Sequence, residues 1–293
     1  MQLLRSYPPP TLTSLVFYSD LIRDLAHLAS DPHIVEVGSE AGAVSVQLSV
    51  IAAQRGGTLT TVEPFPSELV RERARKGALL LVEGYSPQAL EGIGPAGLFV
   101  LDGDHNYGTV MAELQAAFAQ GDPIVVLHDV GWPCGDRDFY YDPSQLAPQD
   151  VLPHSFDRGL GTSAELEPPG MGLWRASPFA MAITSGGPRN GVRTACEDFL
   201  AARPELTWLT TPLVCGLGVM GRRDSPQWTE VETIMAPYVS NPTLEAMERH
   251  RVELMLAWSS REDDLSPGQR WARTLLARSR LRWLRRRLTG TAT

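Results

Sequence analysis

Short apolar runs alternate with amphipathic segments through the first 130 residues. Each of five such runs is followed by residues whose apolar positions have helical spacing. The predicted strands are HIVEVG (33–38), TLTTVEP (58–64), ALLLVEG (78–84), GLFVLDGD (97–104) and PIVVLHDV (123–130). Apolar strands that alternate with helices are typical of a parallel sheet covered on both faces.

The alternation stops after residue 130. Residues 131–188 are rich in Pro, Gly, Asp and Tyr and have little periodicity, which is typical of an active-site lid or a disordered insert. A helix then follows over 189–204, and strands over 206–211 and 215–221 are separated by little more than a proline turn, so we expect them to pair antiparallel. The predicted fold is α/β, a doubly wound, seven-stranded mixed sheet.

Charge and composition divide the chain further. The net charge is −8, but residues 266–293 contain eight arginines and no acid, so the rest of the chain carries −16, which is 8 below the total. So acidic a body excludes nucleic acid as a partner. We predict a domain over 1–227, with the insert at about 131–188, and a helical C-terminal extension over 228–293. Its basic tail either contacts a membrane surface or an acidic partner, or packs on the chain's own acidic body.

The location of the protein follows from what the sequence lacks. No apolar run is long enough to span a membrane, and the N-terminal residues do not resemble a secretory signal. The three cysteines are widely spaced and odd in number, which fits a reducing compartment. We therefore expect a cytoplasmic protein, and the sequence leaves its oligomeric state open.

The loops after the first three predicted strands carry glycines and acids. Glu36, Gly38 and Gly42 surround the first loop, where glycines allow backbone N–H groups to approach a ligand and the acid favours a cationic one. Glu63 ends the second strand, where a carboxylate can accept hydrogen bonds from both hydroxyls of a ribose. The segment Gly84–Ser86 ends the third strand, near the expected position of an adenine.

Ionisable residues end the fourth and fifth predicted strands. Asp102, Asp104 and His105 follow one strand, and His128 and Asp129 end the next. Because the carboxyl ends of parallel strands meet at one edge of a sheet, we expect these side chains to face a common cleft.

These motifs together resemble those of class I S-adenosylmethionine-dependent methyltransferases. The resemblance lies in VEVGSEAG, TTVEP, VEGYS and FVLDGDHNYGTVMAEL, and it is closest to metal-dependent O-methyltransferases that act on small molecules and natural-product sugars. It implies a Rossmann-like methyltransferase fold, with an active-site insert and a helical extension. It also implies that S-adenosylmethionine is bound by residues of these loops: Glu36, Gly38, Ser39, Gly42, Glu63, Gly84, Tyr85, Ser86 and Asp102.

The resemblance further implies a divalent metal ion, Mg²⁺ or Mn²⁺, held by Asp102, His128 and Asp129. Bound to a substrate oxygen, such an ion lowers the pKa of the hydroxyl. A metal-free alternative makes His105 or His128 the general base, with Asp104 or Asp129 orienting the imidazole. In a third alternative these residues are structural, with Asp102 capping the next helix.

The insert bears on the acceptor. Trp132, Phe139, Tyr140 and Tyr141 stand among charged residues, a mixture that suits a sugar or an oligosaccharide, although aromatic residues equally well pack a lid onto the core. The resulting hypothesis is an O-methyltransferase of a sugar hydroxyl. The alternatives are a metal-free enzyme for a phenolic, acid or macrolide acceptor, and a non-catalytic cofactor-binding partner of a glycosyltransferase.

Overall fold

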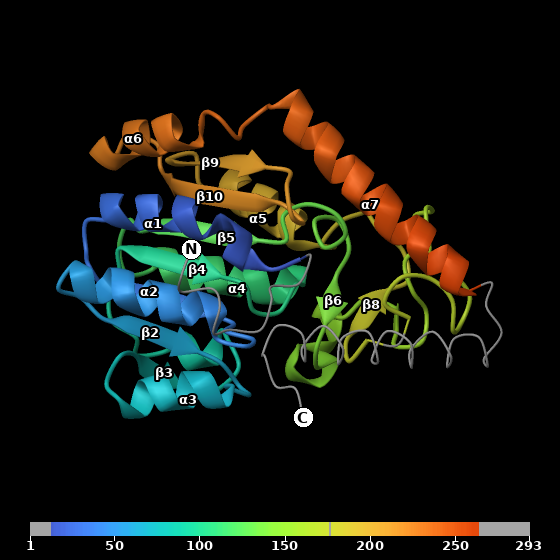
Figure 1. The fold of residues 1–293 in the computed structure, drawn as a ribbon, viewed down its shortest axis with the longest axis horizontal. Helices are drawn as coiled ribbons and strands as arrows, with labels where there is room; N and C mark the ends of the chain where they lie inside the picture. The colour runs from blue at the N-terminus through green and yellow to red at the C-terminus, as the bar shows by residue number, and fades with distance from the viewer. Residues whose placement is uncertain (1–12, 176, 264–293) are drawn as a thin grey trace, which may run out of the picture. The chain divides into compact units, whose positions relative to one another are not determined.

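The computed structural model describes residues 13–175 and 177–263 (Figure 1). The chain forms two compact units. The first comprises the chain up to Phe156 together with Pro178–Arg249, and the second comprises Asp157–Ser177 together with the chain from His250. The arginine-rich tail lies outside the described residues. Among the described helices, none is both long and apolar enough to cross a membrane.

The first unit is built on a seven-stranded mixed sheet. Its strands, from one edge to the other, are β3 (Leu80–Val82), β2 (Leu59–Val62), β1 (Ile34–Val37), β4 (Leu98–Leu101), β5 (Ile124–His128), β10 (Leu217–Arg222) and β9 (Leu206–Thr211). The five strands from β3 to β5 pair in parallel, whereas β10 pairs antiparallel with both β5 and β9. The predicted fold is confirmed, including the antiparallel pair at the end of the domain.

Helices cover both faces of this sheet because the strand side chains alternate between them. Ile34, Leu98 and Val126 belong to one hydrophobic core with side chains of four helices: α1 (Ser19–Leu28), α2 (Ala43–Gln54), α3 (Glu68–Arg75) and α6 (Pro226–Met235). Leu101 and Leu127 point the other way, where α4 (Tyr107–Phe118) packs against α5 (Val192–Ala201). The arrangement directs the carboxyl ends of β1 to β5 to one edge (Figure 1).

The insert contains structure that the sequence did not predict. Within the first unit, β6 (Phe139–Tyr140), β8 (Ala180–Ala182) and β7 (His154–Ser155) form a small antiparallel sheet in that order. In the second unit, Leu160 and Leu173 form an isolated antiparallel bridge. In the region of the predicted helical extension (228–293), the described residues form two helices, α6 and α7 (Pro242–Asp263), because the chain turns through Ser240 with a φ of +49°.

Candidate active site

A cavity of about 620 Å³ opens at the carboxyl ends of the parallel strands, within the size range of small-molecule sites. The loops after β1, β2, β3 and β4 form one wall of it. The insert forms another, through residues that include Tyr141, Asp142 and Gln145. The sequence-predicted residues that line the cavity are Gly38, Glu63, Gly84, Tyr85, Ser86, Asp102 and Asp104.

Gly38 is the position in the first loop where only glycine fits. Its φ is +81°, and a Cβ there would lie 2.1 Å from the carbonyl oxygen of Asp102. The loops after β1 and β4 therefore cross in contact, which brings Asp102 into the cavity wall. Gly42 has a different role: it has a φ of +85° at the start of α2, and a Cβ would lie 2.7 Å from Val70 of α3.

Glu36 lies beneath the cavity rather than in its wall. Its side chain is buried, its pKa is raised to about 7 by that burial, and its Oε2 accepts a hydrogen bond from the Thr61 hydroxyl at 2.9 Å. Glu36 does not line the cavity, and its predicted contact with the cofactor stays a prediction. Like Gly42, it supports the loop from behind.

Glu63 joins the loops after β1 and β2. Its Oε2 accepts hydrogen bonds from the N–H and the hydroxyl of Ser39 at 2.8 and 3.0 Å, and its Oε1 accepts one from the N–H of Phe65 at 3.0 Å. Ser39 thus orients Glu63 and lies outside the main cavity lining. Glu63 and Tyr85 both line the cavity. The rings of Tyr85 and Phe65 lie edge to face, with their centroids 6.0 Å apart.

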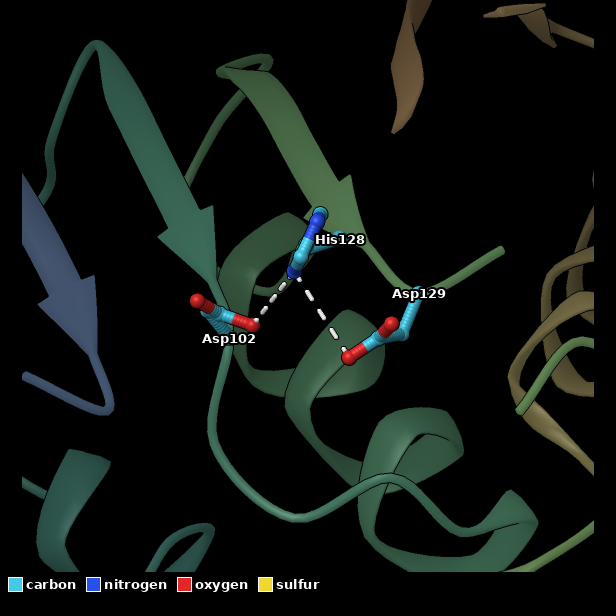
Figure 2. Close-up of side chains that lie close together, drawn as sticks. All are labelled: Asp102, His128 and Asp129. Atoms are coloured by element: carbon cyan, nitrogen blue, oxygen red, sulfur yellow. Dashed lines mark hydrogen bonds and ion pairs between the residues drawn. The ribbon is translucent and has the colours of Figure 1, made fainter. Parts of the chain in front are cut away.

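Asp102, His128 and Asp129 converge where β4 and β5 end (Figure 2). Nδ1 of His128 lies 3.0 Å from Oδ1 of Asp102 and 3.6 Å from Oδ2 of Asp129. One ligand atom from each residue lies within 4.8 Å of the other two. Asp129 adopts a φ of +60°, uncommon outside glycine and tolerated best by Asp and Asn, and strained backbone of this kind clusters at functional sites.

The second nitrogen of His128 determines how this cluster is oriented. Nε2 lies 2.9 Å from the carbonyl oxygen of Val214, which can only accept, so Nε2 carries the proton. Nδ1 therefore points at the two carboxylates. Burial lowers the pKa of His128, but the charges of Asp129 and Asp102 outweigh it and raise the pKa to about 9. An imidazolium or a metal ion would satisfy this arrangement.

His105 pairs with Asp129, one of the two acids predicted to orient an imidazole. Its Nε2 lies 3.2 Å from Oδ2 of Asp129. The prediction that Asp104 orients an imidazole is not supported by this geometry, because Asp104 accepts from the side chain of Asn106 at 2.7 Å and the N–H of Tyr141 at 3.2 Å. Burial raises the pKa of Asp104 to about 6. The third alternative, in which Asp102 caps the next helix, is wrong. The N-cap of α4 is Asn106, whose side chain accepts a hydrogen bond from the N–H of Thr109.

Most of the insert residues expected to contact a sugar are structural. Phe139 and Tyr140 are buried in β6, and Arg137 donates to the carbonyl of Ala182. Asp138 is fully buried and hydrogen-bonded to backbone N–H groups. Of the four aromatic residues that the sequence suggested for a sugar site in the insert, Tyr141 alone lines the cavity, and 50% of its surface is exposed. Val214, which orients His128, was missed because a backbone carbonyl leaves no signal in the residue types.

Part of the chain is similar to a known protein family. Residues 35–130 match the family described as "Methyltransferase domain", which spans β1 to the loop after β5. No curated protein sequence matches the chain. The matched segment contains the four motifs VEVGSEAG, TTVEP, VEGYS and FVLDGDHNYGTVMAEL, and it includes Gly38, where the loops after β1 and β4 are in contact.

Solved structures with a similar fold include three methyltransferases. The O-methyltransferase TomG of Streptomyces achromogenes, involved in tomaymycin synthesis and solved with SAM, is 17% identical, with 75% of this chain and 86% of that chain covered and a TM-score of 0.42. The methyltransferase PaMTH1 of Podospora anserina, bound to SAH, is 17% identical, with 71% of this chain and 77% of that chain covered and a TM-score of 0.43. The O-methyltransferase of Bacillus cereus, in complex with SAH, is 14% identical, with 76% of this chain and 89% of that chain covered and a TM-score of 0.41.

Proposed function

We propose that this chain, which carries a class I S-adenosylmethionine-dependent methyltransferase domain, is an O-methyltransferase that uses a divalent metal ion. The observation that supports the ion is the hydrogen bond from Nε2 of His128 to Val214. Histidine ligands of metals typically donate their other ring N–H in this way, which directs the free lone pair at the ion. Two carboxylates facing that lone pair complete a donor set for a cation.

The residues fit the ion by their chemistry. Carboxylate oxygens suit Mg²⁺ and Mn²⁺, and the imidazole favours Mn²⁺. The ion, when bound, would lower the pKa of the acceptor hydroxyl, and S-adenosylmethionine would supply a methyl group on a sulfonium. Asp102 lines the cavity and also belongs to the metal cluster, so it connects the two sites.

Methyl transfer to a hydroxyl forms a C–O bond, breaks an S–C bond and releases one proton, which a base must take. We assign this role to His105. When its Nε2–H donates to Asp129, its Nδ1 is the proton acceptor, and Asp129 stabilises the imidazolium that forms. Both nitrogens of His128 already face protein groups, so His128 serves less well as a base.

The proposed acceptor is a hydroxyl of a sugar or an oligosaccharide. Such a hydroxyl is a weak acid, and it needs the combination of ion and base that this cleft offers. At the insert wall, the exposed ring of Tyr141 lies beside the polar side chains of Asp142 and Gln145, which supports an acceptor with both C–H faces and hydroxyls.

A metal-free enzyme acting on a phenolic, acid or macrolide acceptor is the second candidate, and the His105–Asp129 pair favours it. Transfer of labelled methyl groups distinguishes the two. Protein treated with EDTA should lose activity and regain it with Mn²⁺ or Mg²⁺, and the acceptor screen should include glycosides, catechols and macrolides. Full activity in excess EDTA would overturn the metal, and transfer to catechols without transfer to any glycoside would overturn the sugar.

A further inference from the structure

The loop between β9 and β10 has an unusual backbone. Val214, Cys215 and Gly216 adopt φ values of +49°, +66° and +84° in succession. Glycine adopts such values freely, whereas a β-branched valine adopts them only under strain. The loop keeps this conformation only if its surroundings hold it.

The group that holds it is the carboxylate of Glu248 in α7. Its Oε2 accepts from the N–H of Val214 at 3.0 Å, and its Oε1 accepts from the N–H of Cys215 at 3.1 Å. The side chain is only 7% exposed, so these are charge-assisted bonds away from most of the solvent. Tyr18 adds a third contact by donating to the carbonyl of Leu213.

The same loop contacts the residues of the metal cluster. The carbonyl of Val214 accepts from Nε2 of His128 at 2.9 Å, and the carbonyl of Cys215 accepts from the N–H of Gly131 at 2.6 Å. Fixing the N–H groups of Val214 and Cys215 therefore also fixes the carbonyls that face His128 and the chain just after Asp129.

We propose that Glu248 is a positioning residue for His128. By holding the left-handed backbone of Val214, it keeps a carbonyl against Nε2 and so turns Nδ1 toward Asp102 and Asp129. This inference rests on the proposed function, in which Nδ1 is a metal ligand. Glu248 itself faces the loop and not the cavity, so its effect on the ion passes through Val214 and His128.

Glu248→Gln tests the proposal. An amide offers one oxygen and one NH₂ group, so it cannot accept from both N–H groups. We expect the NMR signal of the Nε2-bound proton of His128 in ¹⁵N-histidine-labelled protein to shift or disappear. This proton is present whether or not Nδ1 is protonated. Mn²⁺ affinity, measured by electron paramagnetic resonance, should fall by about 10–100-fold. Glu245→Gln, at an exposed position of the same helix, should change neither.

Val214→Gly provides the decisive second arm. Glycine adopts the left-handed conformation without strain, so the double variant Glu248→Gln/Val214→Gly should recover the His128 signal and most of the Mn²⁺ affinity. It also serves if Glu248→Gln alone does not fold. An unchanged His128 signal in folded Glu248→Gln, or no recovery in the double variant, would overturn the proposal. Wild-type protein that binds no Mn²⁺ would instead contradict the proposed metal, and the NMR comparison would still decide the role of Glu248.

Discussion

Two buried aspartates in this domain, Asp138 of the insert and Asp129 at the end of β5, have opposite surroundings. Asp138 accepts from the N–H groups of Tyr107 and Gly191 at 2.8 and 2.6 Å and from the hydroxyl of Tyr140 at 2.8 Å. Asp129 faces the imidazoles of His105 and His128. Fixed backbone donors make a carboxylate part of the scaffold, whereas groups that exchange protons or bind metals leave it available for chemistry.

Asp129→Asn sharpens this comparison most. Asn keeps the shape and tolerates the left-handed backbone, but it removes the charge that faces both histidines. We expect methyl transfer to fall by roughly 10²–10⁴-fold, and the free energy of unfolding to change by less than about 1 kcal/mol. Initial rates with labelled cofactor and urea denaturation measure the two effects.

The matched control is Asp122→Asn. Asp122 precedes the opposite end of the same strand, where it pairs with Arg222 at the surface. Both activity and stability should stay near the wild-type values, since exposed ion pairs contribute little. A large loss of stability in Asp129→Asn would place Asp129 with the scaffold and break the comparison.

Asp138→Ala should have the reverse pattern. Removing the carboxylate leaves three buried donors without their acceptor, so we expect a loss of roughly 3 kcal/mol in the free energy of unfolding. Asp138→Asn retains one acceptor oxygen and should lose less. Cofactor affinity of the folded fraction, measured by calorimetry, should stay close to wild type. If affinity or turnover collapses without a loss of stability, Asp138 acts in the chemistry.

How far the sequence predicted each aspartate follows from the kind of structure around it. Asp129 follows an apolar strand in a regular βα series, so periodicity alone placed it beside Asp102. The insert has no such periodicity. Charged residues next to aromatic ones suggested a sugar surface, but Asp138 and Tyr140 bind each other and the backbone, and only the folded chain reveals this.

The sequence left the partners of the two histidines open for a related reason. The pairing of His105 with Asp129, rather than with its neighbour Asp104, joins the loops after two different strands. The carbonyl of Val214 comes from a third element, 86 residues beyond His128 in the chain. Residue types and spacing indicate which strand ends meet, but not which atoms pair there.

Glu63 combines both kinds of surroundings, because it accepts from backbone donors and also lines the cavity. Glu63→Gln should weaken S-adenosylmethionine binding by roughly 1.5–3 kcal/mol through the loss of a charge-assisted ribose contact. Calorimetry measures this, with Glu83→Gln at the exposed end of β3 as control. Unchanged affinity in Glu63→Gln would assign Glu63 to the scaffold, with Asp138.

Glu113 of α4 is a further buried acid, and it accepts a hydrogen bond from the hydroxyl of Ser86. Burial, with smaller contributions from Asp104 and Asp102, raises its pKa from 4.5 to about 8. Between pH 4.5 and about pH 8, Glu113 therefore keeps its proton in the folded protein and releases it in the unfolded chain. Stability contributed by this group is therefore greatest at low pH and falls as the pH rises toward 8.

Glu113→Gln removes this titration. Relative to wild type, the variant should gain on the order of 3 kcal/mol in the free energy of unfolding between about pH 5.5 and about pH 8.5, measured by urea denaturation at both values. Glu36, whose pKa is also raised, is present in both proteins, so its contribution cancels in the comparison. Parallel stability curves for the two proteins would mean that Glu113 is ionised in the folded state.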